Sequence, residues 1–229
     1  MTGKQARGLF ITGTDTNVGK THVAALIARE LSAAGRRVGV YKPAASGCCM
    51  QGTEVVSGDA VMLWEASGRA GDLERVCPQR FAAPVAPHLA ARGQAEELDL
   101  KLLRTGLDYW TERSEIVVVE GVGGLMSPIG DEEYVADLAD EFGFPLIVVA
   151  RDALGTINHT LLTLVAAVTF RKGLEVAGVV LNQTTELTDA SVPANRRELE
   201  ARCVPPVLGR LDWGATELDR KVDWWELAR

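Results

Sequence analysis

The sequence predicts a three-layer α/β fold, in which a mostly parallel central sheet carries helices on both faces. Short apolar runs alternate with helical patterns along the chain, as they do where strands and helices follow one another. The run Ile116–Val119 is continuous and β-branched, which is typical of a strand that is buried on both sides. Because the sequence shows no internal repeat or linker, we expect residues 1–229 to form a single domain.

Composition narrows the range of functions. Apolar residues make up 47% of the chain and charged residues 24%, which is ordinary for a globular enzyme. The formal net charge of −7 disfavours nucleic acid as a main partner, because phosphate backbones bind clustered Lys and Arg. No apolar run is long enough to span a bilayer, and residues 1–8 lack the apolar core of a signal peptide. We therefore expect a cytoplasmic protein with neither a nucleic-acid nor a membrane partner.

Cysteine spacing supports the same setting. Cys48, Cys49, Cys77 and Cys203 contain no C-x-x-C pair, and the chain has only three His. We interpret the adjacent Cys48 and Cys49 as free thiols in a loop rather than as zinc ligands, as expected in a reducing cytoplasm.

The loop after the first apolar run, Leu9–Ile11, reads Gly-Thr-Asp-Thr-Asn-Val-Gly-Lys-Thr over residues 13–21 and leads into a helical pattern over residues 22–34. A strand, a loop that ends in Gly-Lys-Thr and a helix make the phosphate-binding P-loop of NTPases. Backbone N–H groups and the helix dipole favour an anion there. Lys20 adds a cation for the β- and γ-phosphates, and the Thr21 hydroxyl can bind Mg²⁺.

The spacing of this loop leaves one alternative. Five residues rather than four separate Gly13 from Gly19, so a plain turn that caps a helix would also fit. We interpret the loop as a nucleotide site, because Gly-Lys-Thr lies at the required junction of strand and helix. The fold is then expected to be of the P-loop NTPase type.

The next segment brings a second set of polar groups to the same edge of the sheet. Gly35 should end the first helix, and residues 37–41 predict a second strand. Lys42 and Ser46 follow that strand, and we expect both to face the P-loop crevice, because ligands of open α/β sheets bind at the carboxyl ends of strands. Residues 47–58 should form a loop. A helix begins near Asp59, which could be no more than its N-cap.

The central strand ends in a carboxylate. Glu120 follows Ile116–Val119 and precedes the turn Gly121-Val-Gly-Gly124. Nucleotide enzymes keep a Mg²⁺ partner at this place, although a solvated strand end is the alternative. The glycines would let the backbone approach a phosphate or a substrate closely.

The remaining segments complete the alternation. We expect extended or turning chain at 81–88, helices at 97–113 and 134–142, a strand at 146–149, a helix from 155 to 172, a strand at 174–181, a loop at 183–194, a helix at 198–202, a strand at 206–209 and a helical tail at 216–229. Asn182 stands at the end of its strand. His159 by itself indicates a packing or capping residue, and the Trp residues of the tail indicate packing rather than ligand stacking.

Six motifs in chain order resemble the dethiobiotin synthetase family, whose members close the ureido ring in biotin synthesis. The motifs are the loop at 13–21, Lys-Pro-x-x-Ser-Gly at 42–47, Asp-Ala at 59–60, Pro-His at 87–88, Val-Glu-Gly-x-Gly-Gly at 119–124 and Leu-Gly-x-Ile-Asn-His at 154–159. The longer loop of this family accounts for the extra residue between Gly13 and Gly19. The resemblance covers most of the chain.

The resemblance implies a reaction with defined substrates. These are 7,8-diaminononanoate, CO₂ or bicarbonate, and ATP with Mg²⁺. One amine of the diamine takes up CO₂ to form a carbamate, whose oxygen attacks the γ-phosphate and gives a carbamic–phosphoric anhydride. The second amine then displaces phosphate and closes the ring. Such a path gathers several negative oxygens, so positioning and charge neutralisation should dominate catalysis.

The resemblance also implies roles for individual residues. The implied catalytic residues are Lys20, Lys42 and Thr16; the implied nucleotide contacts are Thr16, Asn17, Val18, Gly19, Lys20, Thr21, Asp59, Glu120, Gly123, Asn182, Leu211, Asp212 and Trp213; the implied metal ligands are Thr21, Asp59 and Glu120; and the implied substrate contacts are Lys42, Ser46, Gly155, Thr156, Ile157 and Asn158. Asn182 would read adenine. Family members are homodimers with a shared active site, in which the helix start at 155–158 meets the substrate carboxylate of the second subunit.

Two other classes share the expected fold. Positioning ATPases of the chromosome-partitioning or septum-site type usually carry a second Lys early in the loop, where this chain has Thr14-Asp15-Thr16. They act on DNA or membranes, but this chain is acidic and residues 217–229 lack a basic face. Amidotransferases of corrin synthesis need a glutamine-hydrolysing domain, for which 229 residues leave no room. We therefore favour the ligase.

Overall fold

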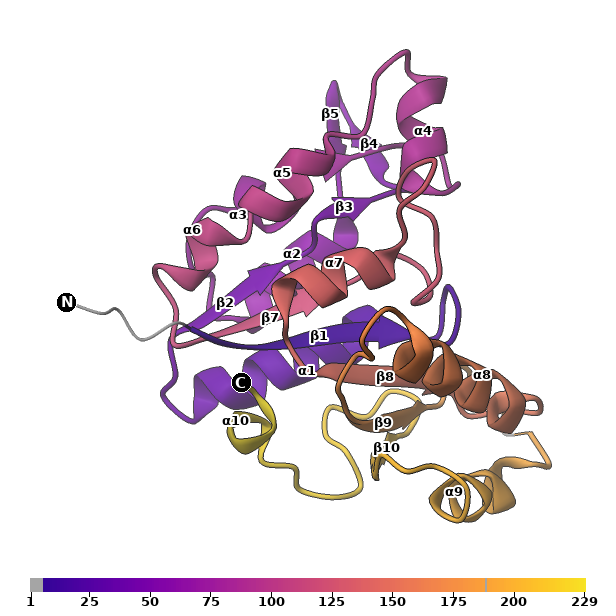
Figure 1. Ribbon diagram of the computed structural model, residues 1–229. Coiled ribbons are helices and arrows are strands. Elements are labelled where there is room, and N and C mark those ends of the chain that lie inside the picture. The colour runs from indigo at the N-terminus through magenta and orange to yellow at the C-terminus, as the bar shows by residue number, and fades with distance from the viewer. Residues whose placement is uncertain (1–5, 188) are drawn as a thin grey trace.

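A six-stranded parallel sheet forms the centre of the molecule. The computed structural model describes residues 6–187 and 189–229, so the first five residues of the polar start lie outside the described residues. Strands pair in the order β10-β9-β8-β1-β7-β2, and each pairing in this sheet is parallel (Figure 1). The predicted α/β fold class is confirmed.

The elements of the described chain are as follows. The strands are β1 Arg7–Gly13, β2 Val38–Tyr41, β3 Ala44–Ala45, β4 Cys49–Gln51, β5 Glu54–Val56, β6 Gln79–Arg80, β7 Ile116–Glu120, β8 Leu146–Arg151, β9 Val176–Asn182 and β10 Val207–Leu211. The helices are α1 Lys20–Ala33, α2 Gly58–Ala66, α3 Leu73–Val76, α4 Pro87–Gly93, α5 Leu100–Thr105, α6 Asp108–Thr111, α7 Val135–Phe142, α8 Thr156–Thr169, α9 Val192–Glu200 and α10 Trp224–Leu227.

Strand β1 lies in the middle of the sheet, and the P-loop begins where this strand ends. It pairs with β7 on one side and β8 on the other, and these three strands are buried over nearly their whole length. Ile11 of β1 lies opposite Glu120 of β7, and Tyr41 of β2 lies opposite Val119. Because parallel strands end at one edge of a sheet, the P-loop, Lys42 and Glu120 emerge side by side.

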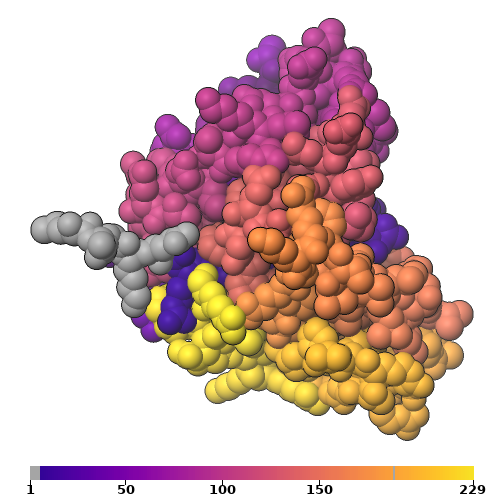
Figure 2. Space-filling model, viewed as in Figure 1, coloured from indigo at the N-terminus to yellow at the C-terminus, as the bar shows by residue number. Residues whose placement is uncertain are grey.

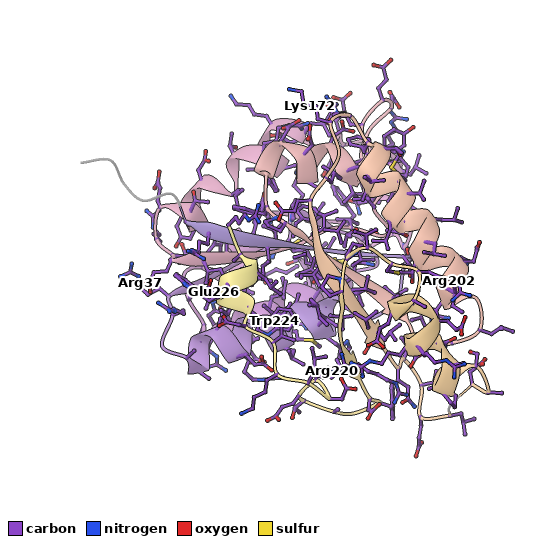
Figure 3. All side chains as sticks on the ribbon, turned by 60° about the horizontal axis from the view of Figure 1, so that its bottom comes forward. Arg37, Lys172, Arg202, Arg220, Trp224 and Glu226 are labelled. Atoms are coloured by element: carbon purple, nitrogen blue, oxygen red, sulfur yellow. The ribbon has the colours of Figure 1, made fainter. Side chains whose placement is uncertain are left out.

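Helices cover both faces of the sheet. The connection from β1 to β2 and the connection from β7 to β8 cross the sheet in opposite directions, so right-handed crossovers place α1 and α7 on opposite faces. Helix α1 packs on β1, β2 and β7 and also contacts α2 and α10, whereas α8 covers β8. Figure 3 shows α1 and α10 on one side of the sheet and the helices of residues 100–170 on the other.

Three segments differ from the sequence prediction in the first half of the chain. The segment 47–58 contains an antiparallel hairpin of β4 and β5, so Cys49 lies in a strand rather than a loop. Pro87 starts helix α4 within the segment expected to be extended, as proline can at a first helical turn. The helix expected at 97–113 divides into α5 and α6 at Gly106, where a Cβ would lie 2.4 Å from the Tyr41 hydroxyl.

Two segments differ in the second half. Helix α9 begins at Val192, inside the segment expected to be a loop, with Pro193 in its first turn. The tail expected to be helical at 216–229 has only the short helix α10, and the chain before it is irregular. Asp219 explains this, because its carboxylate accepts the Arg210 N–H at 2.8 Å and fixes the segment against β10.

Two further features of the structure concern the cysteines and the apolar helices. The four cysteines form no disulfide. Among the residues described, no helix combines the length and the apolar character that a bilayer crossing requires.

The Trp residues of the tail pack as predicted. Trp224 is 3% exposed and its Nε1–H donates to Glu30 Oε2 of α1 at 2.7 Å. The neighbouring Trp225 ring lies under the guanidinium of Arg36, 3.8 Å from the ring centroid. The C-terminal segment is therefore attached to α1 through Trp224 and to the chain that follows α1 through Trp225.

We predict that Trp224→Ala lowers the free energy of unfolding by about 3–5 kcal/mol, because it leaves a large cavity against α1. The matched control is Trp213→Ala, at a ring that is 56% exposed, which should change stability by about 0.5 kcal/mol or less. Urea unfolding of both variants measures the difference. Equal losses in the two variants would contradict this packing role.

Candidate nucleotide-binding site

The P-loop is fixed by one glycine and one amide. Gly19 has a φ of 92°, and a Cβ there would lie 2.0 Å from Asn182 Nδ2. Asn182, at the end of β9, donates through that nitrogen to the Val18 carbonyl at 2.8 Å. Only glycine fits this close approach in the left-handed region, so the loop and β9 are held together.

Lys20 begins α1 and points back into the loop. Its ammonium donates to the Asp15 carbonyl at 2.9 Å, and the residue is 7% exposed. Burial lowers the pKa of Lys20 to about 8, although the nearby Glu120 carboxylate opposes this shift. An additional anion next to Lys20 would therefore stabilise the charged form of its ammonium group.

Lys42 and two carboxylates form a cluster next to Lys20, in which Lys42 and Glu120 are buried and Asp59 is half-exposed. The Lys42 ammonium lies 2.6 Å from Glu120 Oε1 and 2.9 Å from Asp59 Oδ2. The Thr21 hydroxyl also donates to Glu120 Oε1, at 2.8 Å. The Lys42 main chain is held in turn, because its N–H donates to the Val76 carbonyl at 2.7 Å. Residues from β2, α2, β7 and α1 thus meet at one point.

Lys42 and Asp59 shift each other's pKa toward the charged form. Burial alone would lower the pKa of Lys42, but Glu120 and Asp59 raise it above its ordinary value. Burial alone would raise the pKa of Asp59, but Lys42 holds it below its ordinary value. Lys42 and Asp59 therefore each stabilise the charged form of the other.

Both local alternatives for the carboxylates are wrong. Ser57, not Asp59, caps α2, because its hydroxyl accepts the Ala60 N–H at 3.2 Å. Glu120 is 1% exposed, so it is not a solvated strand end. The Gly-rich turn after Glu120 does approach another backbone closely, because a Cβ on Gly124 would lie 3.3 Å from the Gly13 carbonyl.

The cluster fits a hard divalent cation. Glu120 Oε2 is buried and has no hydrogen-bond partner among the residues that the structure describes. In the described ranges, no group of three or more His, Cys, Asp or Glu could hold a metal by itself. A magnesium ion would therefore combine these carboxylates and the Thr21 hydroxyl with oxygens from phosphate and water, as this ion commonly does.

A cleft of about 950 Å³ connects these groups. Most of the predicted site residues line it: Thr16, Asn17, Gly19, Lys20, Thr21, Lys42, Ser46, Asp59, Glu120, Gly123, Asn182, Leu211, Asp212 and Trp213. Val18 is 2% exposed beneath the loop and contributes only its carbonyl to Asn182. The other predicted contacts, Gly155, Thr156, Ile157 and Asn158, lie at the start of α8, outside the described lining of this cleft.

Several residues that line the cleft were not assigned a role from the sequence. Ser127 lines the cleft, and its hydroxyl accepts the Gly124 N–H at 2.8 Å, which stabilises the Gly-rich turn. The chain at 84–87 contributes an apolar side, and Gln183 and Thr184 extend the end near Asn182. The prolines at 84 and 87 lie in the chain predicted to be extended or turning, and Pro87 belongs to the Pro-His motif, but neither signal assigns a ligand contact, and Ser127 carried no signal.

The fold and the cleft define a P-loop NTPase. A family model described as an AAA domain matches residues 7–219. The ATP-dependent dethiobiotin synthetase BioD of Anaeromyxobacter dehalogenans is 46% identical over 210 residues, which cover 90% of each chain. The enzyme of the same name from Bacillus cereus is 40% identical and covers 93% of this chain and 86% of its own, and that of Rhodopirellula baltica is 39% identical and covers 87% and 81%. The chain belongs to the ATP-dependent dethiobiotin synthetase family, a family of ATP-using ligases.

Solved structures with the same fold come from other functional classes. A ParA family ATPase from Chlorobium tepidum has a TM-score of 0.53 at 15% identity, covering 91% of this chain and 84% of its own. The septum site-determining protein MinD of Pyrococcus horikoshii has a TM-score of 0.52 at 16% identity, covering 91% and 82%. Such identities establish a common fold and do not extend to function.

We predict that ATP affinity falls between about pH 8 and pH 9.5, by up to about tenfold per pH unit. Burial lowers the pKa of Lys20 to about 8, so at higher pH the free protein has lost this proton. Phosphates require the cation, and binding must then take up a proton. Calorimetry in two buffers of different ionisation enthalpy measures that uptake.

The control for this prediction is Lys20→Arg, because a guanidinium stays charged throughout this range. Its ATP affinity should be weaker but independent of pH. A wild-type affinity that stays constant over the same range, without proton uptake, would contradict the assignment.

Proposed function

We propose that this chain catalyses the ATP- and Mg²⁺-dependent carboxylation and ring closure of 7,8-diaminononanoate with CO₂, giving dethiobiotin, ADP and phosphate. The observation that carries the proposal is the cluster of Lys42, Glu120 and Asp59 beside the P-loop lysine in one cleft. A carbamate and a γ-phosphate are both anionic, and two ammonium groups lie where they would meet. Membership of the dethiobiotin synthetase family supports the same reaction.

The protein's own residues act chiefly by holding charge in place. One substrate amine takes up CO₂, and Lys42 would stabilise the resulting carbamate while Ser46 orients it by a hydrogen bond. Lys20, Thr16 and the N–H groups of residues 16–20 would hold the triphosphate so that the carbamate oxygen can attack the γ-phosphorus. The second amine then displaces phosphate from the anhydride and closes the ring.

Magnesium would be held by Thr21, Asp59 and Glu120. When bound, it would neutralise phosphate charge during the transfer. Glu120 Oε2, which has no hydrogen-bond partner in the part of the chain that the structure describes, supports this assignment.

The far end of the cleft suits the nucleotide base. Asn182 keeps one amide hydrogen and its carbonyl oxygen for a base edge after donating to Val18. Leu211, Asp212 and Trp213 border the same end, and Asn17 and Gly123 border the phosphate side. We assign the base contacts to Asn182 and the segment 211–213.

A homodimer with a shared active site completes the proposal. An apolar stripe of exposed residues runs along helix α8 and the residue before its start: Leu154, before the helix, is 82% exposed, and within it Leu162 is 59%, Val165 56% and Val168 67% exposed. Figure 2 shows the orange residues of this helix at the surface. The stripe supports pairing of two copies through α8, and the helix start at 155–158 would then meet the substrate carboxylate in the partner's cleft. His159 is exposed on the same helix, so it is not a core packing residue of this chain.

The wider setting follows from composition. We propose that residues 1–229 form one P-loop α/β domain in the cytoplasm, where its four free thiols would stay reduced. Its substrates are small molecules, and the acidic charge disfavours nucleic-acid or membrane partners.

One assay tests the reaction directly. The protein is incubated with ATP, Mg²⁺, bicarbonate and the diamine, and the cyclic urea is sought by mass. Product formation with ADP release that depends on the diamine is expected. ADP release that ignores the diamine would contradict the ligase and favour a nucleotide-switched positioning ATPase.

We predict that Lys42→Ala retains ATP binding but loses ring closure by about 10²–10³-fold, because a charge that stabilises the reacting anions is removed. Lys20→Ala should instead weaken nucleotide affinity. ATP binding and turnover are measured for each variant, with a thermal melt as a check on folding. Unchanged turnover in Lys42→Ala would remove this residue from the mechanism.

We predict that Val165→Asp dissociates the homodimer, because it places a charge in the apolar stripe of α8. The expected readouts are a monomer mass in light scattering and a higher KM for the diamine. Val204→Asp is the matched control, since Val204 is fully exposed elsewhere, and it should remain dimeric. A Val165→Asp protein that stays dimeric would exclude this helix as the interface.

A further inference from the structure

Arg210 does not itself belong to the described lining of the cleft. It lies next to the base end of the cleft, the part that Asn182 and residues 211–213 line. Its guanidinium contacts residues that follow three different strands. Nε lies 2.7 Å from Asp152 Oδ2, after β8; Nη2 donates to Gln183 Oε1 at 2.9 Å, after β9; and Nη1 lies 2.5 Å from Asp212 Oδ1, after β10. A planar fork of donors suits such a three-way contact, whereas a lysine could not reproduce it.

Asp152 is itself held in place by buried neighbours. Asp152 is 4% exposed, and its second carboxylate oxygen accepts from Asn195 Nδ2 of α9 at 2.8 Å. Asn195 is itself 2% exposed. The Asp152 main-chain N–H donates to the Asn182 carbonyl at 2.9 Å. Arg210 is therefore anchored on buried groups that also hold the residue proposed to contact the base.

Main-chain hydrogen bonds of Arg210 hold the segment after β10, which forms the other side of the base end of the cleft. Its N–H donates to Asp219 Oδ1 at 2.8 Å, and the Asp219 N–H donates to the Arg210 carbonyl at 3.0 Å. These bonds close the segment 211–218 into a loop whose first residues line the cleft. The Gln183 N–H in turn donates to the Leu211 carbonyl at 2.9 Å. Both sides of the base end thus converge on one arginine.

We propose that Arg210 is a positioning residue that sets the selectivity for the nucleotide base, by fixing Gln183 and Asp212 on either side of Asn182. This inference rests on the proposed function for the location of the base. Without the fork, the side chains of Gln183 and Asp212 lose their common partner, and the cleft loses its fixed spacing for a purine, although the main-chain pairing of β9 and β10 remains. In the described chain, no hydrogen bond or ion pair joins Arg210 to the P-loop, so we expect the phosphate-binding residues to keep their geometry.

The test measures equilibrium binding of ATP, GTP and CTP to the wild type, Arg210→Met and Arg210→Lys. Binding needs no turnover, so it stays informative if the proposed reaction is not found. The double variant Arg210→Met/Asp152→Asn removes the buried carboxylate charge that the single variant leaves unpaired, and it protects against a folding failure. The matched control is Arg104→Met, since the Arg104 side chain is 25% exposed against 22% for Arg210 and also bridges carboxylates, on α5.

We expect the Arg210 variants, including Arg210→Lys, to bind ATP at least about tenfold more weakly and to lose most of the preference for ATP over CTP and GTP. KM for ATP should rise with little change in kcat, and KM for the diamine should stay constant. Arg104→Met should keep the wild-type preference. A folded Arg210→Met/Asp152→Asn protein with the wild-type order of nucleotide affinities would overturn the proposal.

Discussion

The site depends on a buried ion pair between two neighbouring strand ends. Lys42 leaves β2 and Glu120 leaves β7 with their charged atoms 2.6 Å apart, and both side chains are almost fully enclosed. Such a pair is costly to desolvate and more costly to break, because either partner alone would be an uncompensated buried charge. The parallel ladder of β2 and β7, with Tyr41 opposite Val119, brings the two charges together. Since β1 pairs with β7 and Ile11 lies opposite Glu120, the P-loop begins beside the same pair.

Around this pair the cleft is close to electrically balanced. Lys20 and Lys42 supply two positive charges, and Asp59 and Glu120 supply two negative ones. A phosphate chain alone would meet the carboxylates, and a divalent cation alone would meet the ammonium groups. A polyanion that enters together with a cation satisfies both sets, so the arrangement agrees with the proposed binding of ATP together with Mg²⁺. The arrangement is made by Lys20 of α1, Asp59 of α2, Glu120 of β7 and Lys42 directly after β2.

The sequence carried enough information for the sheet and for most of the cleft. Buried strands read as continuous apolar runs, and the polar residues that follow them share an edge by the geometry of parallel strands, which is why Lys42 and Glu120 could be placed together. Contacts between distant segments gave no such signal. The break in the helix at Gly106 depends on Tyr41, the irregular tail depends on Asp219, and local propensity reports neither. The segment 155–158 lies outside the cleft of its own chain, so only the resemblance to a family assigns it to substrate.

The amide of Asn182 joins two tasks that are often separate in nucleotide enzymes. One hydrogen of its nitrogen is committed to the Val18 carbonyl, inside the loop that would wrap the phosphates. The same nitrogen lies 2.0 Å from the position that a Cβ on Gly19 would take. The amide proposed to contact the base therefore also supports the loop proposed to hold the phosphates, and a substitution of Asn182 itself would change both ends of the nucleotide site at once.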